Sequence, residues 1–229
     1  MKTETEWGYV GEIGPSYWAS LSDEFCACGG SHQSPINLPA GAEPEDLLQV
    51  DIQYRAAKGQ LDYMSYGVQM TLPGGTIQIE DSTHELVQFH FHTPSEHLID
   101  THHYPGEIHL VHLDENGHFT VIAVLMENGS HNPEVDAIWD TFPDVESVPP
   151  MVFDASVLLP DDRTAYVYDG SLTTPPCSEN VTWLVMQQPL TFSDVQIEQL
   201  TAVHASTNIH NSRPVQPLNE RSIRVLRLT

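Results

Sequence analysis

Two short segments of the chain interleave apolar residues with histidines. Residues 88–92 read Gln, Phe, His, Phe, His, and residues 107–112 read Glu, Ile, His, Leu, Val, His. Because successive side chains of a β-strand point to opposite faces, His90 and His92 share one face and the two phenylalanines share the other. The pattern predicts two strands: the first has one apolar face and one face that carries imidazoles, and the second has a histidine on each face.

The second segment can supply a third histidine to the first. If the two strands are neighbours, His109 joins His90 and His92 on one face, together with Glu107. His112 is the alternative third ligand, but no carboxylate shares its face. We favour His109, because metal-bound imidazoles usually donate their second ring N–H to an acceptor such as Glu107.

Three imidazoles without a thiolate are typical of a zinc site. Ligation by His90, His92 and His109 leaves a fourth position open for water, which is the arrangement of catalytic zinc sites. The sequence has no His-Glu-x-x-His, no Gly-x-Ser-x-Gly and no glycine-rich phosphate loop, so it lacks the usual motifs of zinc proteases, α/β-hydrolases and nucleotide-binding enzymes. Zn²⁺ is the expected cofactor.

The charge balance limits the partners of this chain. It has 8 Lys and Arg against 32 Asp and Glu, a formal net charge of −24. Nucleic acid and anionic membranes need a basic surface, so neither is expected as a partner. No apolar run approaches the length of a membrane span, and residues 1–4 do not open a signal peptide. We interpret the acidity as a soluble, self-repelling surface, with halotolerance and calcium capture as alternatives.

The remaining pattern predicts a predominantly β (α+β) fold, in a single domain of residues 1–229. No linker, repeat or low-complexity tract divides the chain, and turn residues at 73–75 and 114–117 separate apolar runs. The expected strands are residues 68–72, 76–79, 86–92, 107–113, 119–126 and 181–186.

Two helices are expected from their N-terminal signals. Asn132 can cap a helix that has Pro133 in its first position, and Ser193 with Gln196 forms a capping box. Residues 11–56, rich in Gly, Pro and Ser, are expected to be irregular. Residues 102 and 103, both histidines, are expected on an exposed loop.

These motifs resemble the alpha-class carbonic anhydrases along nearly the whole chain. The matching segments are residues 7–9, 33–38, 88–92, 95–97, 107–111, 171–177, 181–183 and 211–218. The resemblance implies a central, mostly antiparallel twisted sheet with short peripheral helices and a conical cleft that ends at zinc. It also implies a carbonate dehydratase, a lyase that converts carbon dioxide to bicarbonate and a proton through zinc-bound hydroxide.

The resemblance also implies a role for each residue around the metal. The matched acceptors of the ligands' second N–H groups are Gln88 for His90, Glu107 for His109 and the Asn211 carbonyl for His92. Thr173 matches the threonine that accepts a hydrogen bond from zinc-bound hydroxide and donates its own proton to a glutamate, here Glu96. A hydroxyl whose proton is committed can only accept, so it orients the hydroxide toward substrate.

Carbon dioxide is apolar and uncharged, so its binding site needs apolar walls. The residues that match this pocket in the family are Val111, Val121, Leu172, Thr174 and Trp183. Each of the apolar residues, taken alone, could equally be ordinary core.

The three cysteines leave two alternatives on spacing alone: one long-range disulfide with a leftover thiol, or buried free thiols. The resemblance implies the first, because Cys28 and Cys177 match a pair that exported members join. A periplasmic or secreted protein is therefore expected. The leftover thiol of Cys26 could crosslink two copies of the chain into a homodimer.

One position departs from the family pattern. Fast members carry a histidine on the cleft wall that passes the proton from zinc-bound water to buffer, but no histidine occurs between His32 and His84. The best register places Tyr66 there, with Tyr9 as a second cleft residue. Tyrosine has an unperturbed pKa of about 10 and is a poor relay at neutral pH. We expect slow turnover, limited by proton transfer and rescued by small imidazole buffers.

Two other functions remain as alternatives. A catalytically silent member of the fold could act as a binding module, but such proteins usually lose a zinc ligand, and all three are present here. An acidic secreted protein could instead buffer zinc or calcium, and would then hold several weak metal sites. The enzyme predicts one tight zinc per chain.

Overall fold

A computed structural model describes residues 5–64, 66–142, 148–205 and 210–228 of the chain. Thirteen strands of this part form one large sheet, and three short strands form another. The large sheet contains β2 (Asp46–Leu48), β3 (Val50–Tyr54), β4 (Ala57–Met64), β5 (Gly67–Thr71), β6 (Gly75–Ile79), β7 (Ser82–His92), β10 (Gly106–Leu113), β11 (Phe119–Asn128), β12 (Met151–Phe153), β13 (Thr164–Gly170), β14 (Val181–Met186), β15 (Leu190–Phe192) and β16 (Arg224–Leu228). The small one contains β1 (Asn37–Leu38), β8 (Leu98–Ile99) and β9 (His102–His103).

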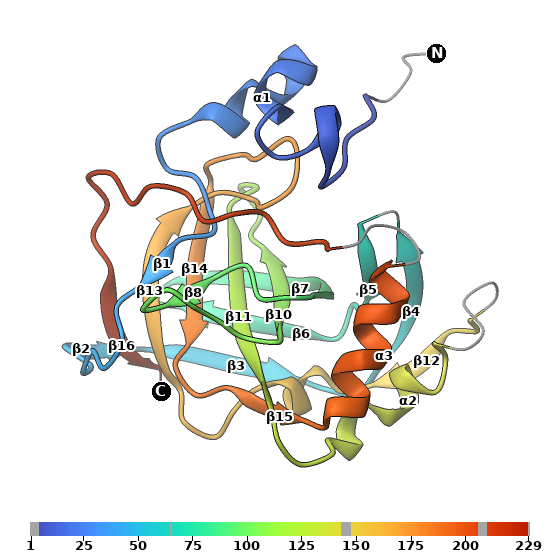
Figure 1. Cartoon of the computed structure of the whole chain (residues 1–229). Coiled ribbons are helices and arrows are strands. Elements are labelled where there is room, and N and C mark those ends of the chain that lie inside the picture. Colours follow the sequence, from blue (N-terminus) through green and yellow to red (C-terminus); the bar gives the residue numbers. More distant parts are fainter. Residues whose placement is uncertain (1–4, 65, 143–147, 206–209, 229) are drawn as a thin grey trace.

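The large sheet is twisted and mixed, with the histidine strands at its centre (Figure 1). Its main path runs β12-β4-β5-β7-β10-β11-β14-β13-β16-β2. Most neighbours are antiparallel, as expected, but β11 runs parallel to β14 and β15, and β16 runs parallel to β2. In the β7–β10 pair His109 lies directly opposite His90, so the alternation of both strands is aligned across the ladder.

Short helices surround the sheet, as the sequence predicts. They are η1 (Gly11–Ile13), α1 (Trp18–Leu21), η2 (Asp23–Gly29), η3 (Pro133–Val135), α2 (Asp136–Trp139), η4 (Ala155–Leu158) and α3 (Asp194–Ala205). Asn132 caps η3 by accepting from the Glu134 N–H, and the predicted single helix is divided into η3 and α2. Ser193 and Gln196 exchange main-chain to side-chain hydrogen bonds at the start of α3, as a capping box does. No helix among the described residues is long and apolar enough to span a membrane.

Two expectations for irregular segments are wrong in part. Residues 11–56 contain the three short helices η1, α1 and η2 and the strands β1, β2 and β3, and β3 pairs with β6 over five residues. His102 and His103 are exposed as expected, but they pair with β8 instead of forming a loop. The partner of β3 is remote in sequence, and the strands β8 and β9 are only two residues long. Local composition therefore gives no sign of either pairing.

The two faces of the central strands bury different sets of side chains. Phe89, Phe91, Ile108 and Leu110 belong to the larger apolar cluster on one face, which α2 and α3 cover with side chains such as Trp139. The opposite face carries the histidines beside a smaller cluster that includes Val111, Val121 and Trp183. The strict alternation of the sequence therefore separates the main core from the site.

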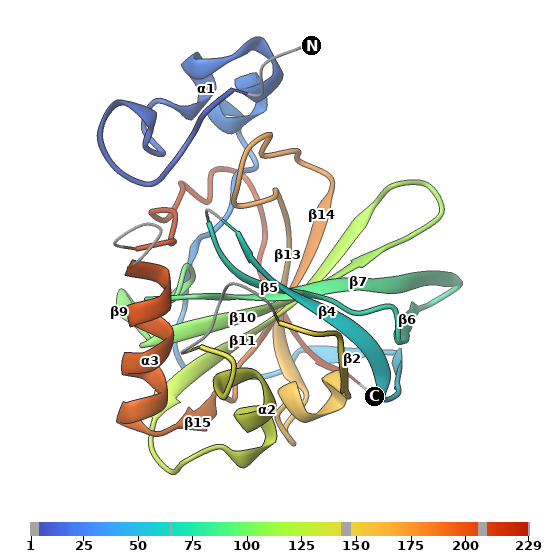
Figure 2. The same ribbon diagram turned by 90° about the vertical axis from the view of Figure 1, so that its right-hand side faces the viewer.

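The N-terminal segment packs at one end of the sheet, beside the loop between β13 and β14 (Figures 1 and 2). The Cys28–Cys177 disulfide joins the two, which confirms the predicted pairing, and Cys26 is free and exposed. A small aromatic cluster packs around the disulfide and reaches Tyr66; it contains Trp7, Tyr9 and Trp18.

Loss of this disulfide should destabilise the protein. The bridge joins residues separated by 149 positions, so it restricts the unfolded chain strongly, and a Cys28→Ser/Cys177→Ser variant should lose about 2–5 kcal/mol of unfolding free energy. Urea unfolding measures this loss, with Cys26→Ser as the matched control that should leave the midpoint unchanged. Equal midpoints for the double variant and the control would contradict the expectation.

Candidate metal centre

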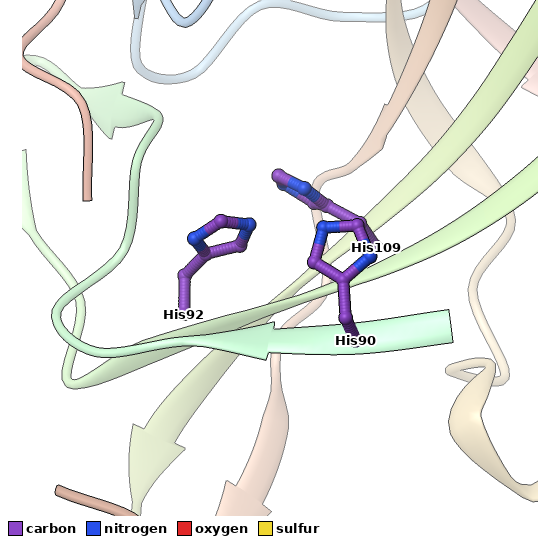
Figure 3. A group of neighbouring side chains, drawn as sticks. All are labelled: His90, His92 and His109. Atoms are coloured by element: carbon purple, nitrogen blue, oxygen red, sulfur yellow. The ribbon is translucent and has the colours of Figure 1, made fainter. Parts of the chain in front are cut away.

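Three histidines converge on one face of the β7–β10 pair. His90 and His92 lie on β7 and His109 on β10, and one nitrogen from each lies within 4.8 Å of the others (Figure 3). Their ring centroids are 4.5 to 5.2 Å apart. This is the set that strand alternation predicts.

The second nitrogen of each ring is committed to an acceptor. The pairs are His90 Nδ1 with Gln88 Oε1 at 2.8 Å, His92 Nδ1 with the Asn211 carbonyl at 2.6 Å, and His109 Nε2 with Glu107 Oε1 at 2.8 Å. These acceptors need an N–H, so the opposite nitrogen of each ring carries a lone pair. The atoms left to face one another are His90 Nε2, His92 Nε2 and His109 Nδ1.

This donor set fits a zinc ion. His92 Nε2 is buried and has no hydrogen-bond partner among the described residues, although a buried polar atom normally has one. Burial lowers the pKa of His92 to about 4 and lowers the pKa values of His90 and His109 as well, so all three are neutral at pH 7. Three neutral imidazole nitrogens that face one spot match catalytic zinc sites.

A second group of possible ligands is already saturated with hydrogen bonds. Glu107 accepts from His109 and from His97 Nδ1 at 2.7 Å, and its other oxygen accepts the main-chain N–H groups of Glu96 and His97 at 2.8 Å. His97 Nε2 contacts the Tyr168 hydroxyl at 2.6 Å. Burial raises the pKa of Glu107, but His97 and His109 outweigh it and hold that pKa well below its usual range. Glu107 is therefore an anionic anchor for His109.

The alternative ligand His112 lies on the other face of β10. Its Nε2 is 2.6 Å from the Tyr54 hydroxyl, and its Nδ1 is 3.1 Å from the Thr120 carbonyl. Both ring nitrogens have partners there, so His112 is part of the packing behind the sheet.

Glu96 and Thr173 lie beside the three histidines. Glu96 Oε2 is 3.4 Å from His92 Nε2, and Glu96 Oε1 accepts the Arg213 main-chain N–H at 2.8 Å. Burial raises the pKa of Glu96 to about 7, while His109, the Arg213 N–H and a hydrogen bond from the Thr173 hydroxyl act to lower it. A cation held by the histidines would favour the charged carboxylate further.

A cavity of about 200 Å³ opens above the histidines. It is lined by the three histidines, Thr173 and Thr174, by Tyr66, Gln69 and Gln88, and by the apolar residues Val111, Phe119, Val121, Leu172 and Trp183. All five residues expected in a substrate pocket are in this lining. Contrary to the sequence prediction, the lining formed by the described residues does not include Tyr9, whose ring packs against Trp7 and Trp18 in the aromatic cluster.

Gln69 and Phe119 line the cavity but are absent from the sequence prediction. Gln69 pairs with His90 across β5 and β7, and Phe119 shares a strand face with Val121. Strand parity could have found Phe119. Gln69 needed the β5–β7 register, which only the tertiary structure gives.

A family comparison decides what kind of centre this is. The sequence profile of the family described as Eukaryotic-type carbonic anhydrase matches residues 13–227. The chain belongs to the alpha carbonic anhydrase family. Carbonic anhydrases hydrate carbon dioxide to bicarbonate with a zinc ion, so the chain is a zinc-dependent carbonate dehydratase, a lyase.

Individual carbonic anhydrases agree with this membership. A carbonic anhydrase of Neisseria gonorrhoeae is 39% identical over 224 residues, which cover 96% of this chain and 87% of that protein. The structure of the alpha-carbonic anhydrase of Thermovibrio ammonificans, solved with the inhibitor sulfanilamide, has a TM-score of 0.87 and 37% identity, covering 99% of this chain and 100% of that one. The Photobacterium profundum enzyme gives a TM-score of 0.85 and 37% identity, over 98% and 100% of the two chains.

Proposed function

We propose that His90, His92 and His109 hold one zinc ion per chain, and that Thr173 and Glu96 orient the nucleophile beside it. The observation that carries the assignment is the buried, unpartnered His92 Nε2, which faces the free nitrogens of the other two rings. Gln88, Glu107 and the Asn211 carbonyl fix the tautomers that point these nitrogens inward.

A zinc ion bound there supplies the Lewis acid that makes water a nucleophile near neutral pH, as is known for this family. The residues of the chain do the rest. The Thr173 hydroxyl donates a hydrogen bond to Glu96, so its oxygen is left to accept a hydrogen bond from the nucleophile. The Arg213 main-chain N–H donates to Glu96 Oε1 and so helps to hold the carboxylate in place.

The apolar side of the cavity suits carbon dioxide. Val111, Val121, Leu172 and Trp183 form a wall without free polar groups, since the Trp183 indole N–H donates to the Ser171 carbonyl at 3.1 Å. An uncharged, apolar substrate gives up little hydration free energy when it binds against such a wall. The polar product bicarbonate binds poorly there. We propose this wall as the substrate site.

The proton that the reaction releases has a poor exit at Tyr66. This side chain stacks on Trp7, with ring centroids 5.7 Å apart and an interplanar angle of 17°. Burial, and then the charge of Asp62, raise the pKa of Tyr66 above its usual value of 10. Tyr66 keeps its proton at neutral pH, so we propose that buffer must take the proton at the cavity directly.

Turnover should therefore depend on buffer. In stopped-flow hydration of carbon dioxide at pH 7.5, kcat should rise with imidazole concentration, and Tyr66→His should raise kcat about tenfold in dilute, bulky buffer. Tyr66→Phe is the matched control, because it removes only a hydroxyl that does not titrate here, and it should leave kcat within about twofold. A high kcat that does not depend on buffer in the unmodified enzyme would contradict this proposal.

We also propose that residues 1–229 form one domain of an exported protein. The disulfide supports export to the periplasm or the medium, because such bonds persist in oxidising compartments. The exposed Cys26 thiol supports a crosslinked homodimer, and the charge of −24 supports function at high salt. Gel filtration with and without reductant, and activity against salt concentration, test these points. The silent and metal-buffering alternatives are not favoured.

A further inference from the structure

Arg213 is the buried arginine next to the site, and its side chain points away from it. The residue is 2% exposed. One guanidinium nitrogen, Nη1, donates to Gln33 Oε1 and the Ser34 carbonyl at 2.8 Å, and Nη2 donates to the Cys28 carbonyl at 2.9 Å. The guanidinium carbon lies 5.4 Å from the ring centroid of Trp18. Burial lowers the pKa of Arg213 to about 10, so the group is charged at neutral pH.

The two ends of this residue hold two different parts of the protein. Its main-chain N–H binds Glu96 Oε1, whereas its side chain binds the N-terminal segment at Cys28. Cys28 is bonded to Cys177, and the Cys177 N–H donates to the Thr174 carbonyl at 2.9 Å. The path from Glu96 through Arg213, Cys28 and Cys177 thus returns to the loop that carries Thr173.

We propose that Arg213 is a positioning residue. By closing this ring of contacts, it holds Glu96 and Thr173 in a fixed position relative to each other. The proposal rests on the roles proposed above for Glu96 and Thr173. Without the side-chain anchor, the main chain at residue 213 is free to shift, and the Glu96 carboxylate shifts with it. A displacement of about 1 Å at a reacting centre can cost up to about 10²-fold in rate.

Arg213→Lys tests the anchor with the charge retained. A lysine ammonium cannot reproduce the planar fork that reaches three acceptors at once. We expect kcat/KM for hydration of carbon dioxide to fall about tenfold, mainly through kcat, with zinc content still one per chain by atomic absorption. Arg221→Lys is the matched control. Arg221 also donates to carbonyls, including that of Gln33 at 2.8 Å, but its main-chain N–H binds the Leu218 carbonyl and not the site. Its kcat/KM should stay within about twofold of the parent value.

A double-mutant cycle with Glu96→Gln separates positioning from general destabilisation. If Arg213 acts through Glu96, Arg213→Lys should change kcat/KM less than about twofold in the Glu96→Gln background. A full tenfold loss in both backgrounds, or a loss equal to that of Arg221→Lys, would overturn the proposal. If Glu96→Gln itself left kcat/KM unchanged, the proposed role of Glu96 would fail first, so the two failures can be told apart.

A second variant covers the case in which Arg213→Lys does not fold. Gln33→Met removes one acceptor of the guanidinium and leaves the arginine in place, although it also removes the hydrogen bonds of Gln33 Nε2 to the Cys177 carbonyl and Glu179. It should show a smaller loss of kcat that also disappears in the Glu96→Gln background. The unfolding midpoint in urea, measured on the zinc-free protein, reports stability independently of activity. A loss of kcat that followed this midpoint across all variants would show a purely structural role.

Discussion

Replacing His109 with alanine should remove the zinc and abolish the hydration of carbon dioxide. The imidazole is one of three proposed ligands, and its loss leaves two nitrogens and a buried Glu107 without its partner. We expect kcat/KM to fall by about 10⁴-fold, roughly 5.5 kcal/mol of transition-state stabilisation. Stopped-flow assays together with zinc analysis of the dialysed protein measure both effects.

His112→Ala is the matched control for this substitution. His112 lies three residues further along β10, is also buried, and contacts Tyr54 and Thr120 on the other face. Its removal should cost about 2–3 kcal/mol of unfolding free energy and leave one zinc per chain. If His112→Ala lost the zinc and His109→Ala kept it, the choice of ligand from strand parity would be wrong.

Thr173→Val should keep the zinc and lose most of the activity. Valine has nearly the same shape as threonine, but it can neither donate to Glu96 nor accept from the nucleophile. Removing one such preorganised group commonly costs about 10²-fold in kcat, so we expect a loss of this size in stopped-flow hydration. Zinc content and the urea midpoint should stay close to those of the parent protein.

Thr173→Ser is the comparison that isolates the hydroxyl. Serine keeps the donor and acceptor and removes only a methyl group, so kcat should stay within about tenfold of the parent value. Equal losses of activity in the serine and valine variants would contradict a role for the hydroxyl, because the effect would then come from packing around the loop.

The metal site could be predicted from the sequence because strand periodicity is a local property. The alternation of residues 88–92 and 107–112 separates His90, His92 and His109 from the core, and the structure pairs His90 with His109. A bulge in the β7–β10 pair lies between Val111 and His112, beyond the three histidines, so it does not disturb their parity. The alternation of side chains is therefore regular over the three histidines.

Other parts of the site depend on contacts that a single sequence does not encode locally. Asn211, Thr173 and Glu96 came from the family resemblance, because they lie on loops whose path is set by distant packing. Gln69 depends on the register of β5 against β7. Arg213 belongs to a matched motif, yet its link between Glu96 and Cys28 exists only in the folded chain.

The cavity wall explains how an intact metal site can coexist with slow turnover. We propose that the three histidines and Glu107 form the complete metal site, while Tyr66 stands at the proposed proton exit. Its stacking on Trp7 holds the ring in place, and burial keeps its hydroxyl protonated. A single side chain can therefore limit turnover without any change at the metal.

Titration of the zinc-free protein with zinc is the sharpest test of a single three-histidine zinc centre. Zinc is first removed with a strong chelator, and hydration of carbon dioxide is then measured by stopped flow after each addition of Zn²⁺. We expect no activity without metal and a linear rise that stops at one equivalent per chain, with no rise for His109→Ala. Activity that survived removal of zinc, or that kept rising over several equivalents, would contradict a single three-histidine zinc centre.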